Sequence, residues 1–524
     1  MSGAARDLAR AGMVVTSALF VSRILGWVRV AVIAASLGIS RDLDIYIAAF
    51  RIPDFIFQLV AAGALASAVI PTIAALVATG EQERAWRVVS TIANLLMLVL
   101  AAVALITFVA APALAPFIAP GFGAEDLETL VLLTRILLVS PIFLALSAVA
   151  TSILNSAGRF SASVMAPIVY NLVIIAAAVI LVPRFGLAGL AWGTVGGAAA
   201  TVLVQVVPVF RGVGFHYAPA VDLHDREARK TLVLLGPRAL GLAGSQLTLL
   251  FLTMLGSTLT AGAIGAFALA FTIFQIPLGT IAYPLGIVAL PALSQRVAAG
   301  EIDEYVALVT RALRLLGFAM LPLACIAAGM ALEVIDLVVD FGKVNQEGIA
   351  LTGAAFLGLL AALPTEAAII VLSRAFFAAR NTWIPVGAAL VSVVVAVGTA
   401  LLLVGPLGIL GLALGLTVAS WVEAALLLAA FRSRHARFGL LRLGRAHLGY
   451  LAAALAAGFV ADRSYDLFGG SLGTDPGVVP AALALGGAGV VGLAVYAGLA
   501  AALRVPELGV TIRLVRSGLS RGAA

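Results

Sequence analysis

The chain has 524 residues, of which 63% are hydrophobic and only 11% are charged, and its mean hydropathy is +1.15. Soluble domains carry about one-quarter charged residues, so this composition excludes an ordinary soluble enzyme and indicates a membrane protein with many spans. The net charge of +7 would suit a nucleic-acid binder, but the basic residues gather in connections between apolar stretches. The single cysteine, Cys325, lies in an apolar run, and the four histidines are scattered. We therefore expect no nucleic acid, no internal disulfide and no metal site.

Apolar stretches of about 20 residues or more are long enough to cross a bilayer. In chain order they predict an all-α polytopic membrane protein with about fourteen transmembrane helices. These helices lie near residues 12–37, 43–79, 86–118, 127–155, 160–182, 186–210, 230–257, 262–298, 305–340, 348–379, 383–404, 407–431, 446–463 and 479–503. Several contain proline, which removes a backbone hydrogen bond and bends a helix. We expect these kinked helices to line an internal space.

The basic residues predict the orientation of the chain. Most of the 32 lysines and arginines fall in loops on one side, and the few in loops on the other side are Arg41, Arg184, Lys343 and Arg463. Because cytoplasmic loops carry the excess of Lys and Arg, both termini are expected in the cytoplasm. The remaining arginines lie inside predicted spans: Arg23, Arg29, Arg51, Arg135 and Arg238.

An internal repeat recurs at an offset of about 220 residues. Ala68–Pro71 followed by Gly80-Glu81 returns as Val288–Pro291 followed by Gly300-Glu301. The other pairs are Phe122-Gly123 with Phe341-Gly342, Ala157–Arg159 with Ala378–Arg380, and Phe185–Ala191 with Leu407–Ala413. The repeat predicts a six-helix lobe at 1–210, a cytoplasmic linker at 211–229, a second six-helix lobe at 230–432, and two extra helices with a basic tail at 433–524. Transporters built from such repeats bind substrate between the two lobes.

The first predicted helix has a polar face. Ser22, Gly26 and Arg29 share one stripe of the helix, and Arg23 lies about 100° around the axis. A charge inside a membrane segment is costly and normally faces a protein interior or a watery cavity. This face therefore predicts a site for an anion.

The second predicted helix continues the pattern. Asp44, Arg51 and Gln58 are spaced by sevens and share a stripe, and Asp54 lies one turn beyond Arg51. Guanidinium groups match phosphate oxygens in pairs and stay charged, so they suit a diphosphate. In a purely structural alternative, Arg51 pairs with Asp54 or Asp44, and the first-helix arginines snorkel or pair. Three arginines against two acids would still leave excess positive charge.

Other polar residues inside the predicted spans give weaker indications of function. Asn94 and Asn171 are typical helix–helix hydrogen-bonding partners, and Glu366 and Glu423 are weak candidates for coupling to sodium or protons. No cofactor is expected, and transport could be coupled to sodium, protons or the membrane potential. Nucleotide-binding and metalloprotease motifs are absent from the sequence, which disfavours an enzyme.

Five segments resemble the MurJ (MviN) lipid II flippase family of the multidrug/oligosaccharidyl-lipid/polysaccharide exporter superfamily. They are Ser22–Arg29, Ala49–Pro53, Ala61–Ala64 leading to Pro71, Ala119–Phe122, and Asp222–Gly241. The resemblance implies two lobes around a cationic cavity, alternating access, and a groove for the undecaprenyl tail formed by the last two helices. It also implies the bacterial inner membrane and a cargo of lipid II or a related undecaprenyl-diphosphate lipid. We expect a monomer, with membrane lipids and cell-wall synthesis proteins as its other partners.

The same resemblance implies residue roles. Arg23 and Arg29 would hold the diphosphate together with Arg51, whose position is usually basic in the family, and Asp44 would match an acidic residue near the periplasmic gate.

The sequence also departs from the family pattern. A usual basic pair is replaced by Phe57-Gln58, and a usual glutamate by Ala62. The usual acid after Arg29 is Val30, and an arginine and a glutamate of the eighth helix appear as Thr272 and Gln275. We therefore predict that Arg238 supplies a compensating cation in the second lobe.

These observations favour a flippase that moves lipid II from the cytoplasmic to the periplasmic leaflet. The alternatives are a flippase for another undecaprenyl-diphosphate glycan, a drug exporter of the same superfamily, a non-transporting cell-wall scaffold, and a membrane glycosyl or phosphoglycosyl transferase. A drug exporter would have acidic cavity walls, and a transferase would need a sizeable loop with acidic or metal-binding residues.

Overall fold

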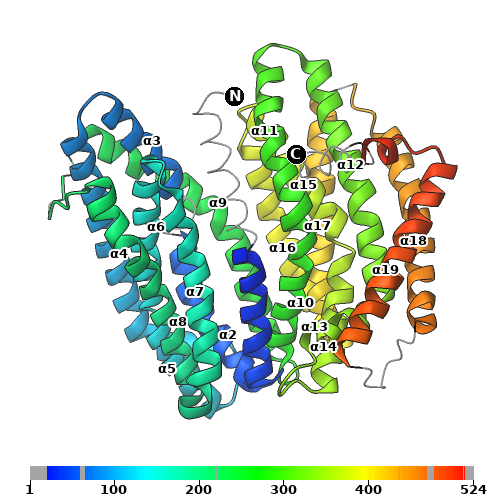
Figure 1. Cartoon of the computed structure of the whole chain (residues 1–524), viewed down its shortest axis with the longest axis horizontal. Coiled ribbons are helices and arrows are strands. Elements are labelled where there is room, and N and C mark those ends of the chain that lie inside the picture. The colour runs from blue at the N-terminus through cyan, green and yellow to red at the C-terminus, as the bar shows by residue number, and fades with distance from the viewer. Residues whose placement is uncertain are drawn as a thin grey trace. The chain divides into compact units, whose positions relative to one another are not determined.

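The computed structural model describes residues 21–59, 65–219, 221–222, 224–435, 437–468, 477–511 and 513. Regular structure in these residues is helical throughout (Figure 1). Ten of the helices are long and apolar enough to cross a membrane, or eleven if the bent pair Gln346–Leu360 and Leu363–Ala378 is one span. The protein is therefore an all-α polytopic membrane protein, and the total of fourteen spans stays a prediction.

The chain forms two compact units. Unit 1 contains residues 1–265 and 341–345, and unit 2 contains residues 266–340 and 346–524. The predicted boundaries between lobes, linker and extra helices stay predictions.

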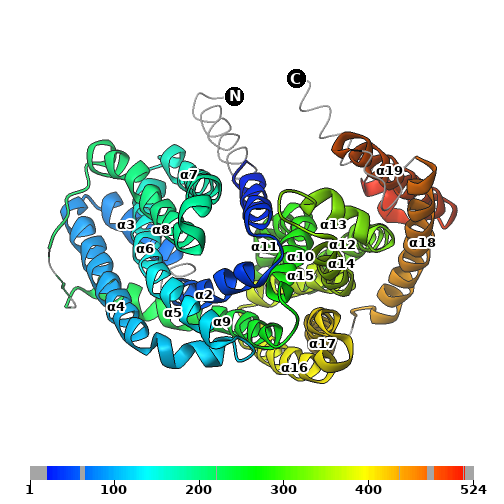
Figure 2. The ribbon, with the colours of Figure 1, turned by 90° about the horizontal axis from the view of Figure 1, so that it is seen from below.

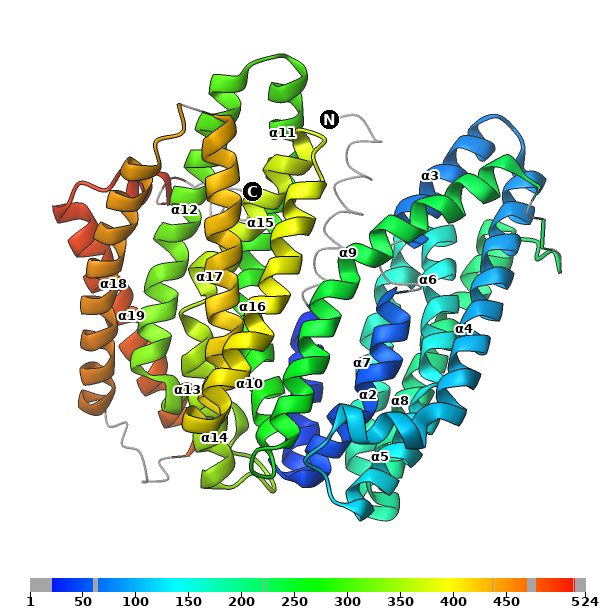
Figure 3. The same ribbon diagram turned by 180° about the vertical axis from the view of Figure 1, so that it is seen from behind.

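Unit 1 begins with a helix over residues 21–37. Its further elements are α2 (Arg41–Phe57), α3 (Leu65–Ala78), α4 (Gln82–Ile118), α5 (Ala124–Leu137), α6 (Ser140–Ser156), α7 (Phe160–Ile180), α8 (Val182–Val207), η2 (Pro208–Val213) and α9 (Arg226–Ser257). Helix α7 packs along α8, α6 lies on α8 and α3, and α9 contacts α4 (Figure 3). Buried aliphatic residues of α4 and α6, such as Ile92, Leu100 and Ile153, form the core between them.

Helix α10 (Ala263–Pro277) begins in unit 1 and continues into unit 2. The remaining elements are η3 (Leu278–Ala282), α11 (Tyr283–Ala298), α12 (Ile302–Gly329), α13 (Ala331–Val339), α14 (Gln346–Leu360), α15 (Leu363–Ala378), α16 (Trp383–Leu407), α17 (Ile409–Arg434), α18 (Leu440–Leu467) and α19 (Val478–Ala502). Helix α16 packs along α17, and α18 packs on both α12 and α19 (Figure 2).

The repeat is visible in the backbone. Gly80 and Gly300 both have positive φ angles, of 79° and 74°, and both end a helix with the same pair of hydrogen bonds back to the preceding turn. Gly186 and Gly408 both have φ of 56°, where only glycine is free of strain. Both interrupt an apolar helical stretch, so each glycine changes the direction of the chain at the equivalent position of its repeat.

A third pair of turns corrects the sequence register by one residue. The sequence alignment places Gly158 opposite Ala379, but the structure gives the left-handed conformation to Gly158 (φ 70°) and Arg380 (φ 56°). Each donates its N–H to the carbonyl three residues earlier, Asn155 and Phe377 respectively. The turn is thus kept in unit 2 although its glycine is replaced.

The last two helices are fixed to unit 2 by close backbone contact. A Cβ at Gly458 of α18 would lie 2.4 Å from the Cys325 carbonyl oxygen of α12, so only glycine allows this approach. Tyr496 of α19 donates its hydroxyl to the Phe318 carbonyl at 2.9 Å. That carbonyl lacks its usual helical donor because the residue four positions on is Pro322. Cys325 itself is half-buried.

Candidate functional site

Arg29 is held by helix α7. Its guanidinium lies over the ring of Tyr170, with the Cζ atom 5.5 Å from the ring centroid. The next residue, Asn171, donates its amide to the Ser22 carbonyl at 3.3 Å, and its Nδ2 would lie 3.9 Å from a Cβ at Gly26. Stacking on an aromatic face uses the face of the guanidinium and leaves its N–H edge available to an anion. Asn171 is the helix–helix partner that the sequence predicted.

Arg51 of α2 is held by helix α9. Its Nε donates to the Thr253 hydroxyl at 2.8 Å, and Thr253 donates in turn to the Leu249 carbonyl. Asp54, one turn further along α2, attracts Arg51 electrostatically and is hydrogen-bonded to Gln58. The guanidinium is therefore anchored through Nε, and its terminal nitrogens are the groups that can bind a ligand.

Arg29 and Arg51 belong to one electrostatic neighbourhood, which we call the arginine cluster: Arg29, Arg51, Asp54, Tyr46 and Tyr170. Arg29 interacts with both tyrosines, and Asp54 interacts with Tyr170 and Arg51. The Tyr46 hydroxyl is hydrogen-bonded to Thr194 of α8 at 2.8 Å. Two arginines against one carboxylate leave a net positive charge among half-buried side chains, which is costly unless an anion binds there.

Arg23 lies on the helix that carries Arg29 and is exposed. The structure does not bring it into the cluster, so its contact with the diphosphate stays a prediction. Arg135 hydrogen-bonds the Phe108 carbonyl at 3.1 Å and stacks on the Phe108 ring. Pro112 removes the N–H donor that this carbonyl would have within α4, so Arg135 supplies the missing hydrogen bond.

Asp44 has a different role from that of an Arg51 partner. It is fully buried, and its carboxylate accepts the N–H of Gly262 at 2.7 Å and that of Gly265 at 2.8 Å. These residues form the start of α10, so Asp44 caps that helix from α2. Arg41 lies 3.8 Å from the same carboxylate. Asp44 therefore joins α2 to the start of α10.

The glycines of this cap permit the close approach. A Cβ at Gly262 would lie 2.6 Å from the Ile39 carbonyl oxygen, and its φ is +90°. A Cβ at Gly265 would lie 2.6 Å from the Leu43 side chain. We call Asp44 with these two N–H groups the α10 cap.

In unit 2, the carboxylates of Glu366 and Glu423 interact with one another. Glu366 is hydrogen-bonded to Ser420, and Glu423 to Ser392, which links α15, α16 and α17. The Ser420 hydroxyl also bonds Thr365 at 2.9 Å. The described residues contain no group of three or more metal-ligating side chains.

The predicted compensating cation, Arg238, lies on α9, but its side chain is outside the described ones. Thr272 donates to the Ala268 carbonyl of its own helix, and Gln275 is exposed. A half-buried guanidinium in unit 2 is Arg374 of α15, which lies against Gly286.

Sequence reasoning missed Tyr170, Tyr46 and Thr253 as members or holders of the cluster. Tyr170 and Tyr46 are tyrosines within apolar helices, and tyrosine normally needs a hydrogen-bonding partner when buried, which was the available signal. Thr253 gave none, because threonine is common in membrane helices.

The long apolar helices and the repeated turns define a polytopic membrane protein with a duplicated architecture. A solved structure titled "Lipid II flippase MurJ, inward closed conformation" has the same fold, with a TM-score of 0.77 and 19% identity over 94% of this chain and 98% of that one. A multidrug resistance MATE family transporter of the MOP superfamily also shares the fold, at a TM-score of 0.65 and 17% identity over 80% of this chain and 98% of that one.

The family model "Lipid II flippase MurJ" matches residues 33–464, so the chain belongs to this family. A probable lipid II flippase MurJ of Rhizobium tropici is 30% identical over 77% of this chain and 77% of its own. The lipid II flippase MurJ of Burkholderia cenocepacia is 26% identical over 82% of this chain and 84% of its own.

Proposed function

We propose that this protein is a lipid II flippase of the bacterial inner membrane, a transporter and not an enzyme. It moves the undecaprenyl-diphosphate-linked headgroup from the cytoplasmic to the periplasmic leaflet by alternating access, for peptidoglycan synthesis. The observation that carries this proposal is the arginine cluster, a net positive charge held between packed helices of a chain in the MurJ family. Both termini lie in the cytoplasm, and the protein works as a monomer.

In this proposal the two anchored arginines bind the diphosphate. Tyr170 holds the face of Arg29, and Thr253 holds Nε of Arg51, so the free N–H groups of both point at the ligand's oxygens in a fixed geometry. Asp54 lowers the affinity by repelling the diphosphate, which helps its release. Arg23 contacts the headgroup from the exposed end of the same helix face.

The α10 cap acts as the gate. Asp44 holds α2 and the start of α10 together in one state, and this contact must break when the other side of the carrier opens. Because the carboxylate is fully buried, the closed state also excludes water from this region.

Glu366 and Glu423 are the proposed coupling site. Two carboxylates that interact inside a membrane favour uptake of a cation, either a proton or sodium, which relieves their repulsion. Replacing both by glutamine should make transport insensitive to collapse of the corresponding gradient. Transport that still stops with that gradient would exclude the pair.

The proposal is tested by depletion and complementation in a bacterium that lacks its own lipid II flippase. Lipid II on the outer leaflet is scored by its cleavage by an added lipid II-degrading enzyme. Wild type should restore growth and cleavage, whereas Arg29→Gln and Arg51→Gln should lower transport by about tenfold each, as expected for losing a charge-assisted contact of about 1.4 kcal/mol. Arg184→Gln, an exposed arginine at another end of unit 1, is the matched control.

Failure of the wild type at normal expression would favour another lipid-linked glycan or a scaffold role. Rescue that is equal in wild type, Arg29→Gln and Arg51→Gln would exclude the diphosphate role of the cluster while leaving transport intact.

A further inference from the structure

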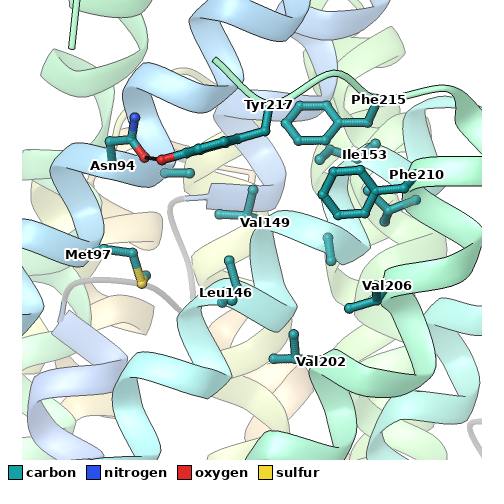
Figure 4. Close-up of a pocket in the computed structure, with 13 residues that line it drawn as sticks. Asn94, Met97, Leu146, Val149, Ile153, Val202, Val206, Phe210, Phe215 and Tyr217 are labelled. Atoms are coloured by element: carbon teal, nitrogen blue, oxygen red, sulfur yellow. Dashed lines mark hydrogen bonds between the residues drawn. The ribbon is translucent and has the colours of Figure 1, made fainter. Parts of the chain in front are cut away.

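Unit 1 contains an apolar cavity that the proposed transport pathway does not use. Its volume is about 290 Å³, and it lies between α4, α6 and α8, with η2 and the residues after it as its roof (Figure 4). The deeper walls are aliphatic, with Met97, Val149 and Val202 among them. An apolar cavity of about 150 Å³ binds benzene, so this one has room for a chain of on the order of ten carbon atoms.

The cavity opens on the apolar surface of the unit. Leu146, Val206 and Phe210 line it, yet 38%, 37% and 48% of their respective surfaces are exposed. On membrane-spanning helices such apolar surface faces hydrocarbon, so the ligands that reach the opening first are lipid chains.

The roof is fixed by hydrogen bonds. The Tyr217 hydroxyl donates to the Asn94 side chain at 2.7 Å (Figure 4). Asn94 in turn donates to the Ala218 carbonyl at 3.3 Å. The Ala218 N–H donates to the Ser90 hydroxyl at 3.1 Å. Because α4 holds this segment in place, the cavity is a built feature of the unit.

The roof also marks the depth of the cavity in the bilayer. Phe215 contacts Trp86 and Phe210 edge to face, with ring centroids 5.4 and 5.7 Å apart. Tyr217 of the same roof is 54% exposed, and exposed tyrosines gather where the hydrocarbon meets the headgroups. The mouth therefore lies at headgroup level, and the aliphatic walls extend into the hydrocarbon.

Two arginines flank the mouth. Arg211 follows the lining residue Phe210 in η2. The Arg159 guanidinium lies over Gly212, where a Cβ would be 2.6 Å from its Nη1. Both arginines are exposed, and neither forms an ion pair with another described residue. Their charge complements an anionic headgroup, and each arginine near the surface of an anionic membrane is worth about 1 kcal/mol.

We infer that this cavity binds one acyl chain of an anionic diacyl phospholipid from the bilayer, with the phosphate of the headgroup on Arg159 and Arg211. The lipid acts as a structural ligand of unit 1 and does not depend on the proposed flippase activity. Its chain fills the space between α4, α6 and α8 and supports the roof segment that leads into α9.

The test uses the full-length protein with phosphatidylglycerol and phosphatidylcholine as probes. Native mass spectrometry counts retained lipid, and thermal unfolding in detergent with added lipid gives the relative affinity. Wild type should retain one phosphatidylglycerol and prefer it to phosphatidylcholine. Arg159→Gln with Arg211→Gln should lower the affinity for phosphatidylglycerol about thirtyfold, about fivefold from each arginine, and leave that for phosphatidylcholine unchanged.

Ala150→Phe fills the cavity and should abolish retention of either lipid. Ala101→Phe, on the exposed face of α4, and Arg184→Gln are the matched controls and should behave as wild type. Equal retention by Ala150→Phe and wild type would overturn the inference, as would displacement of the lipid by undecaprenyl phosphate, which would make the polyprenyl chain the occupant.

A measurement on the wild type covers the case that Ala150→Phe does not fold. Phosphatidylglycerol with a photoreactive acyl chain should label residues 146–153 or 202–210 of the unmodified protein. Labelling confined to other segments would overturn the inference.

Discussion

Replacing Asp44 by asparagine tests the α10 cap. The carboxylate accepts two backbone N–H groups, at 2.7 and 2.8 Å, in a fully buried position. An asparagine can accept only one of them and turns its own N–H₂ toward the other, so one buried donor is left unsatisfied and a charge-assisted bond is lost. The expected cost is about 2 kcal/mol, which raises the population with α2 detached from α10 about thirtyfold.

The assay uses the fact that Cys325 is the single cysteine of the chain. In a Cys325→Ser background, a cysteine replaces Ile264, which is 3% exposed beside the cap. The rate of thiol labelling is proportional to the detached population, so Asp44→Asn should raise it about thirtyfold at unchanged global fold, checked by gel filtration.

Asp126→Asn is the matched control, because Asp126 contacts the same Arg41, at 3.7 Å, but is partly exposed and does not bond the cap. Its labelling rate should stay within about twofold of the parent, as expected for an exposed ion pair. A wild-type labelling rate in Asp44→Asn would refute the view that the carboxylate holds α10.

Substitutions at three further positions follow from contacts in the structure. Gly262→Ala should destabilise the protein by at least about 1 kcal/mol in thermal unfolding, because φ is +90° and the new Cβ would lie 2.6 Å from a carbonyl oxygen; no loss would contradict this geometry. Tyr170→Phe should keep most lipid II binding and Tyr170→Leu should lose about fivefold, because only the aromatic face holds Arg29; equal affinities, measured with the purified protein, would remove Tyr170 from the site. Tyr496→Phe should lower the free energy of unfolding by about 1–3 kcal/mol because the Phe318 carbonyl loses its donor, and an unchanged denaturation midpoint would show that water replaces the hydroxyl.

The fold class can be predicted from the sequence because the lengths of the apolar stretches and the internal repeat can be read directly from it. It also carries the polar face of the first helix, because helical phase alone brings Ser22, Gly26 and Arg29 together. It does not carry the anchors, because Tyr170 and Thr253 lie more than a hundred residues from the arginines they hold. The cap of α10 could not be predicted from the sequence for a further reason. Its donors are backbone N–H groups of Gly262 and Gly265, which have no side-chain signature.

The one-residue correction at Gly158 and Arg380 has a similar cause. A sequence alignment matches residue types, so it places Arg159 opposite Arg380. The backbone aligns conformations, and the left-handed residue of unit 2 is not a glycine. Packing of the helices on either side therefore dictates this turn, and glycine only makes it less strained.

Because the fold is duplicated, the two halves can be compared to separate the features that the fold needs from those that it does not need. Features that recur in both halves, such as the helix-ending turns at Gly80 and Gly300 and the breaks at Gly186 and Gly408, are what this helical bundle requires in order to form. Features confined to one half are free to serve a task. At the offset of 220 residues that relates Pro71 to Pro291, Arg51 and Asp54 of unit 1 correspond to the apolar Phe271 and Phe274 of unit 2. The fold therefore does not require these charges, and the charge difference between the two halves is encoded in one copy of the duplicated helical unit.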